Sequence, residues 1–144
     1  MKDFIETRII TAVRELLVGK VNGFLSEAQF AIPLIELGGY EGGSAVCPLI
    51  SLATCERTEK ERIIRLDTYS LTISFNLPEM PEREMYCYAY SAAFGKAVSE
   101  NPTLGGVVDR AVITGKKYVP PKKAHCGEGW GLVLTLRITV EGLS

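Results

Sequence analysis

Two stretches of the chain alternate apolar and polar residues regularly enough to predict β-strands. From Tyr69 to Leu77 the apolar residues fall at every second position, with hydroxyl and amide residues between them. The closing stretch LVLTLRITV, residues 132–140, has the same period. Because successive side chains of a strand point to opposite faces, this period indicates a sheet with one apolar and one polar face. We expect Leu71, Ile73 and Phe75 to meet Leu134 and Leu136 in the core.

Two helices are expected to cover the apolar face. From Asp3 to about Leu25, apolar residues recur at helical spacing while charged residues mostly fall on other faces. A second helix is expected at about Pro81 to Ser99, since proline suits the first position of a helix. Its three alanines spaced four apart, Ala89, Ala93 and Ala97, let a helix lie close to a sheet. Asn101 stands before Pro102, where helical backbone angles are disfavoured, and so ends this helix.

The remaining segments predict turns and two further strands. The junction ENPTLGGVVDRA, residues 100–111, places two glycines after the helix and predicts a corner that returns the chain into a strand at Val107 to Thr114. Another strand is expected near Pro48 to Cys55, followed by a polar turn, ERTEKER, at residues 56–62. The glycine-rich segment Gly38 to Ser44 and the segment Pro120 to Gly129 are expected to be the most mobile parts of the chain.

These elements predict an α+β fold. The sheet is expected to be mixed but mainly antiparallel, with about four strands packed with two helices in the order α-β-β-α-β-β. At 144 residues the chain has the length of one domain, residues 1–144. Its composition, 47% hydrophobic and 23% charged, is typical of a folded globular chain and argues against disorder.

Charge and hydropathy restrict the environment. The formal net charge of -1 provides no global attraction to nucleic acid or to an anionic membrane. No apolar run approaches the roughly 20 residues of a membrane span, and charged residues interrupt the N-terminal region where a signal peptide needs an apolar one. We therefore expect an intracellular protein with no membrane contact.

The sequence contains no familiar catalytic or cofactor-binding pattern. Gly38 and Gly43 have the spacing of a phosphate-binding loop, but Ser44 stands where the lysine is needed. The single histidine, His125, neighbours Cys126, and the four cysteines form no C-x-x-C pair. We expect the cysteines to be small buried residues. We also expect that the protein binds no metal or cofactor and has no enzymatic activity. A hydrolase using carboxylates such as Glu82, Glu84 or Asp109, or a small-molecule binder, stays as an alternative.

Two segments are candidate contact sites for partners. A basic loop with aromatic residues is expected between the last two strands, and it contains Lys116, Lys117, Tyr118, Lys122 and Lys123. Such a loop either contacts a nucleic-acid backbone or forms a solvated hairpin whose lysines discourage association of strand edges. The glycine-rich loop is expected either to be an ordinary flexible loop or to become ordered on contact with a partner, in which case Gly39, Tyr40 and Gly42 are the candidate contacts.

The order of elements, the NPTLGGVVDRA junction and the closing LRITVEGL strand resemble those of phage and prophage tail terminator proteins, also called tail completion proteins. The resemblance extends over nearly the whole chain. It implies a homo-oligomeric ring, commonly hexameric, that caps the tail tube and joins it to the head. It also implies contacts with the tail tube protein and the head completion or connector protein, no catalytic centre, and a location in the virion tail after assembly in the host cytoplasm.

Three alternatives to this interpretation stay open. Head-tail connector proteins and minor tail proteins share the same character. A small nucleic-acid-binding module using the loop at residues 116–130 belongs to another functional class. Within a ring, nucleic acid would be a partner only by passing through it.

Overall fold

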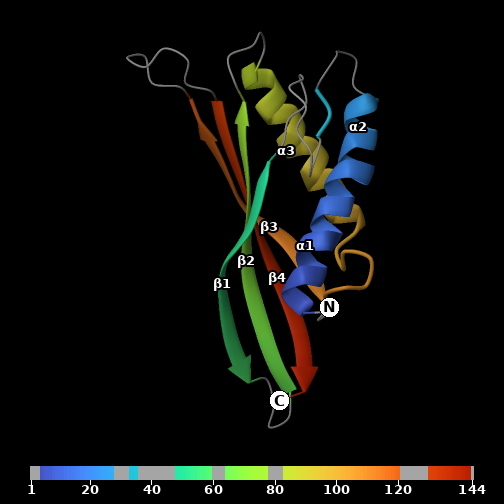
Figure 1. Cartoon of the computed structure of the whole chain (residues 1–144), viewed down its shortest axis with the longest axis vertical. Helices are drawn as coiled ribbons and strands as arrows, with labels where there is room; N and C mark the ends of the chain where they lie inside the picture. The colour runs from blue at the N-terminus through green and yellow to red at the C-terminus, as the bar shows by residue number, and fades with distance from the viewer. Residues whose placement is uncertain are drawn as a thin grey trace.

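The computed structural model of the chain describes residues 4–27, 33–35, 48–59, 64–77, 83–120 and 130–143. Its four strands form one antiparallel sheet in the order β1-β2-β4-β3. The helices lie together on one face of this twisted sheet, and none of the described residues forms a helix on the other face (Figure 1). The expected α+β class and the order of its elements are confirmed, and the sheet is antiparallel throughout.

The N-terminal helical segment is continuous but changes its winding. Helix α1 (Ile5–Leu16) leads into a π-helical turn, η1 (Leu17–Val21), and then into α2 (Asn22–Ser26). Its buried residues include a series spaced four apart: Ile9, Val13, Leu17, Val21 and Leu25. A spacing of four drifts around a helix of 3.6 residues per turn, and a wider π turn reduces that drift. The winding therefore keeps the apolar residues facing the sheet.

The two central strands supply the sheet side of the hydrophobic core. They are β2 (Ile64–Leu77) and β4 (Trp130–Leu143), which pair so that Leu71 lies opposite Leu136 and Ile73 opposite Leu134. These four side chains are fully buried, and Phe75 is nearly so. The expected core face is confirmed. Its other side follows the alternation, with the hydroxyl residues of β2 turned away from the helices.

Helix α3 (Arg83–Glu100) packs on the same face and ends as expected before Asn101. Ala93 and Ala97 are buried and Ala89 is half-buried, so the row of alanines lies on the packed side. Tyr90 is fully buried and stacks on Phe75, with ring centroids 5.2 Å apart and planes 8° from parallel. This contact joins the helix to the centre of the sheet.

The junction after α3 is a corner, as the sequence predicts. Gly105 and Gly106 adopt positive φ angles of 73° and 88°, a conformation that glycine reaches without steric cost. The carbonyl of Thr103 accepts hydrogen bonds from the backbone N–H groups of Gly106 and Val108. The side chains of Leu104 and Val108 are buried in the core. The corner thus anchors the start of β3.

The two outer strands extend beyond their expected bounds. Strand β1 (Leu49–Glu59) includes residues 56–59, which were expected to form a polar turn, because they pair with β2. Strand β3 (Arg110–Val119) begins three residues later than expected, after the corner, and continues through Lys116, Lys117 and Tyr118, which were expected in a loop. Cross-strand pairing decides both cases, since an outer strand tolerates charged residues at its solvent-exposed edge.

Some expectations fall on parts of the chain that the structure does not describe. Residues 38–44 and 121–129 lie outside the described residues, so the expected mobility of these segments stays a prediction. Pro81, the expected first residue of the second helix, also lies outside them. Among the helices of the described ranges, none combines the length and the apolar character that a bilayer span requires.

Candidate functional site

The basic residues of β3 do not form a single patch. Strand β3 alternates, so that Lys116 pairs with Leu134 and Lys117 with Val133 of β4. Lys116 therefore lies on the helix-covered side of the sheet, where it lines a cleft between β3 and α3. Lys117 lies on the side without helices. The candidate contact residues that precede Tyr118 are thus divided between two faces.

Tyr118 is held against α3. Its hydroxyl donates a 3.0 Å hydrogen bond to Ser91 Oγ, and its ring meets the ring of Tyr88 edge to face at a centroid distance of 5.3 Å. The Tyr88 hydroxyl in turn donates a 2.8 Å hydrogen bond to Glu84, which raises the pKa of Tyr88. Tyr118 packs the outer strand onto the helix and is only partly available to a partner.

The other predicted contact residues cannot be placed. Lys122 and Lys123, as well as Gly39, Tyr40 and Gly42, lie outside the described residues. Their assignment as partner contacts stays a prediction. Asp109 and Glu84, two carboxylates considered for a hydrolase, lie in separate contacts. The Asp109 carboxylate accepts a 2.6 Å hydrogen bond from the backbone N–H of Glu141, while Glu84 binds Tyr88.

The face of the sheet without helices is rich in hydroxyl groups. Rows of residues cross it from β1 to β3, and one row runs from Ser51 through Thr72 and Thr135 to Gly115. Ser51 and Thr72 approach within 3.1 Å through their side-chain oxygens. We call this surface the open face. Its members on β1, β2 and β4 include Ser51, Thr54, Thr68, Ser70, Thr72, Ser74, Thr135 and Thr139.

A shallow hollow of about 300 Å³ lies on the open face. Thr54, Ser70, Thr114 and Arg137 line it together with Glu56. Arg137 is exposed and comes from the middle of β4. The hollow has hydroxyl groups, one guanidinium and one carboxylate, a composition that suits polar contact with another macromolecule.

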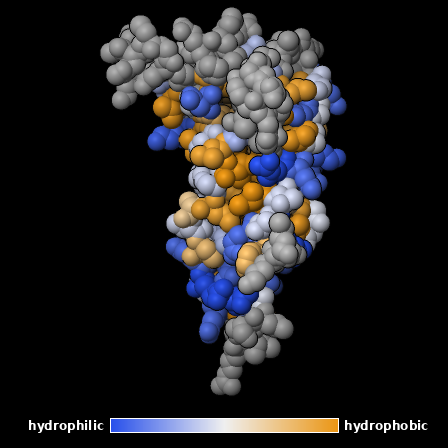
Figure 2. Space-filling model, viewed as in Figure 1, coloured by the Kyte–Doolittle hydropathy of each residue, from blue (hydrophilic) through white to orange (hydrophobic). Residues whose placement is uncertain are grey.

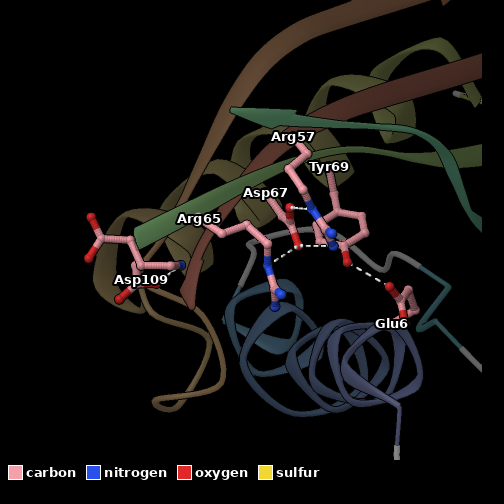
Figure 3. Close-up of polar contacts among 7 residues, drawn as sticks. Glu6, Arg57, Arg65, Asp67, Tyr69 and Asp109 are labelled. Atoms are coloured by element: carbon pink, nitrogen blue, oxygen red, sulfur yellow. Dashed lines mark hydrogen bonds and ion pairs between the residues drawn. The ribbon is translucent and has the colours of Figure 1, made fainter. Parts of the chain in front are cut away.

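A second polar cluster lies where the start of α1 meets the sheet (Figure 3). Asp67, which is only 4% exposed, accepts a 2.7 Å hydrogen bond from Arg57 Nε, and Arg65 Nε lies 3.4 Å from its other oxygen. Beside it, Tyr69 donates a 2.6 Å hydrogen bond to Glu6. The contacts connect α1 with β1 and β2, and each carboxylate is engaged by a donor from within the chain.

The groups of this cluster shift one another's pKa values. The hydrogen bond from Arg57 lowers the pKa of Asp67, against the opposing effect of burial. The hydrogen bond from Tyr69 lowers the pKa of Glu6. Burial, together with the hydrogen bond to Glu6, raises the pKa of Tyr69 well above its usual range. Both carboxylates therefore stay ionised at neutral pH, and the hydrogen bonds of the cluster hold helix α1 and strand β1 to strand β2.

The amino-acid sequence alone does not reveal this cluster, although it contains one signal of it. Asp67 falls on the same alternation as Tyr69 and Leu71, so its side chain had to point to the helix-covered face. A buried carboxylate needs a partner. The register that brings Arg57 opposite Asp67 arises only from strand pairing.

The thiols are not equivalent. Cys87 is buried, as expected, whereas Cys55 is exposed on the outer strand β1, so the expectation that all four cysteines are buried is wrong for Cys55. Cys47, Cys126 and His125 lie outside the described residues. Within the described ranges, no cluster of three or more histidine, cysteine, aspartate or glutamate residues is arranged to hold a metal ion.

No protein-family model matches the chain, and no curated protein matches it significantly in sequence.

Proposed function

We propose that the chain is a structural subunit of a phage particle that assembles with copies of itself into a ring at the end of the tail tube. The observation that carries this proposal is the sheet itself. In the described part of the chain it is covered by helices on one face only, and the outer edges of β1 and β3 have no neighbouring strand. Such a subunit presents distinct surfaces to its neighbours and to the tail.

The hydroxyl-rich chemistry of the open face agrees with a role in assembly. Interfaces between separately folded proteins are about as polar as the rest of the surface, and hydroxyl groups supply hydrogen bonds without the desolvation cost of charges. A ring requires heterologous contacts, in which two different patches of each subunit meet. The resemblance in element order to tail terminator proteins gives the proposal its biological setting, the junction of tail and head.

A second candidate is contact with a nucleic-acid backbone. Three cations, Arg110, Lys117 and Arg137, belong to the open face. Phosphate contacts of this kind make binding strongly salt-dependent. In a ring whose open face lined the channel, both functions would be combined. Without a ring, the chain would be a small nucleic-acid-binding module.

Two measurements test the proposed function. Light scattering and negative-stain microscopy of the purified chain, with and without tail tubes, should show a closed ring or its formation on the tubes. Deleting the gene from a phage or prophage that carries it should give unjoined heads and tails, or tails of abnormal length. Normal infectious particles from the deletion would refute the assignment.

If instead the chain bound duplex DNA as a monomer, with affinity falling steeply between 50 and 200 mM salt as phosphate contacts require, the second candidate would replace the first. Arg137→Gln should then weaken binding to any DNA sequence. The same substitution should leave ring formation intact if the ring is held by other residues.

A further inference from the structure

The two outer strands run in opposite directions, which has a geometric consequence for a repeated sheet. In an antiparallel sheet with an even number of strands, the first strand and the last are antiparallel to each other. If the next copy is related by rotation about an axis along the strands, its β3 lies beside β1 of the first copy in antiparallel orientation. The sheet then continues across the boundary without a change of pattern.

The charges at the two edges are complementary at the same level of the sheet. One row runs from Glu56 on β1 through Thr68 and Thr139 to Arg110 on β3. Glu56 and Arg110 are both exposed, and neither forms an ion pair within the described part of the chain. Continuing the sheet with no axial shift would set Glu56 of one copy opposite Arg110 of the next.

Apolar residues match three rows further along the strands, on the opposite, helix-covered face of the sheet. The row through Leu71 and Leu136 begins at Leu52 on β1 and ends at Ile113 on β3, and both of these end residues are only partly buried. Figure 2 shows apolar side chains gathered on the middle of the molecule and hydrophilic ones predominating towards its lower end. The same continuation would bring Leu52 beside Ile113, an apolar cross-strand pair.

A cleft beside β3 provides space for an added strand. It has a volume of about 480 Å³ and lies between α3 and β3, with Gly95 and Val98 on the helix side and Ala111 and Ile113 on the strand side. Side chains of a neighbouring β1 that point towards the helices, such as Leu52, would enter this cleft. The cleft is thus placed to receive the apolar side of the β1 edge.

We infer that β1 of one copy pairs with β3 of the next copy, so that the ring is closed by one sheet continuing from subunit to subunit. The inference deepens the proposed function and rests on it for the ring. The partner is a second copy of this chain, identified by complementary charge, matching apolar level and strand direction. Both edges also carry a β-bulge, at Leu52/Thr54 and at Ile113/Gly115, and β3 carries lysines. These are devices that also protect edges from pairing, so a purely protective role is the competing outcome.

A cross-linking experiment tests the pairing directly. In a full-length chain with Cys47, Cys55 and Cys126 replaced by serine, Glu56→Cys and Arg110→Cys are introduced together. On mild oxidation we expect a ladder of covalent oligomers, since cross-strand positions on adjacent strands lie within disulfide reach. The matched control, Ser51→Cys with Arg110→Cys, joins levels far apart along the strands and should give no ladder.

Charge reversal gives an independent measurement. Glu56→Arg places like charges at every boundary and should weaken self-association at least roughly tenfold in light scattering. Arg110→Glu should do the same, and the two changes together should restore association. Circular dichroism and thermal melts of each variant establish that folding is unchanged. Restoration by the double variant cannot result from misfolding of either single one.

The outcomes separate this inference from the proposed function. A ring that forms normally without cross-linking and without sensitivity to charge reversal would overturn the edge pairing and leave the tail function standing. A chain that stays monomeric with and without tail tubes would overturn the edge pairing too, and would favour protected edges. Edge-paired oligomers together with a harmless gene deletion would refute only the tail function.

Discussion

Tyr69 and Glu6, 63 residues apart in sequence, are joined by a 2.6 Å hydrogen bond from the phenol to the carboxylate. Tyr69 lies on the second strand of the sheet and Glu6 in the first turn of α1. The bond therefore fixes the N-terminal helix at one end of the sheet. Asp67, two residues before Tyr69, attaches β1 to the same region through Arg57.

Removing the phenol hydroxyl should loosen this attachment. Tyr69→Phe is expected to lower the free energy of unfolding by about 0.5–1 kcal/mol, which is less than a hydrogen bond to a charged group usually contributes, because Glu6 is exposed to solvent. Urea denaturation measures the loss. In a double-mutant cycle with Glu6→Ala, the two effects should not add. Additive losses would show that the bond contributes nothing to stability in solution.

Acid should destabilise the protein through the same cluster. The pKa values of Asp67 and Glu6 are lowered in the folded chain. Their contribution to stability is complete above the pKa of unfolded carboxyl groups, about 4, and is lost as the pH falls through the lower folded values. The free energy of unfolding should therefore decline from about pH 4 downwards, measured by urea titrations at successive pH values.

Substitution of the buried carboxylate isolates its share of that decline. Asp67→Asn should lower the free energy of unfolding at pH 7 by about 1–2 kcal/mol, because the acceptor of the Arg57 hydrogen bond loses its negative charge. The loss is moderate because solvent screens the exposed Arg57 guanidinium. It should also flatten the acid decline. Glu15→Gln, an exposed change on α1, serves as the control and should keep the slope of the native chain. An unchanged slope in Asp67→Asn would contradict the assignment.

The stacked pair of Phe75 and Tyr90 predicts a large packing effect. Phe75→Ala should lower the free energy of unfolding by about 3–5 kcal/mol, because it leaves a cavity under α3 at the centre of the sheet. Phe75→Leu preserves most of the buried volume and should cost about 1.5 kcal/mol or less. A loss below about 1 kcal/mol for the alanine variant would show that this contact is not part of the core in solution.

Two glycines with open space around their α-carbons should respond in opposite directions. Gly105→Ala is expected to destabilise by about 1–2 kcal/mol, because its φ of +73° is unfavourable for a residue with a Cβ atom. Gly23→Ala, in helix α2, should stabilise by about 0.5–1 kcal/mol, since alanine is the better helix former. Thermal melts of the two variants measure the difference. A tolerated Gly105→Ala would mean that the corner is not fixed in this conformation.

The sequence by itself determined the layers of this fold and the C-terminal end of its second helix. Alternation along β2 and β4 is a property of neighbouring residues, so it specifies which side of each strand is apolar before any strand pairs. The proline after Asn101 and the pair of glycines at 105 and 106 likewise act on the local backbone, and the corner they predict is present.

Only the tertiary structure decided where the outer strands end and which polar residues meet. Residues 56–59 and 116–118 look like turn and loop because local composition reports solvent exposure, and an outer strand is exposed too. Strand pairing fixes the register, and the register brings Arg57 to Asp67, separates Lys116 from Lys117, and aligns Glu56 with Arg110 across four strands. These relationships depend on contacts between distant segments, whose geometry no local pattern of residues contains.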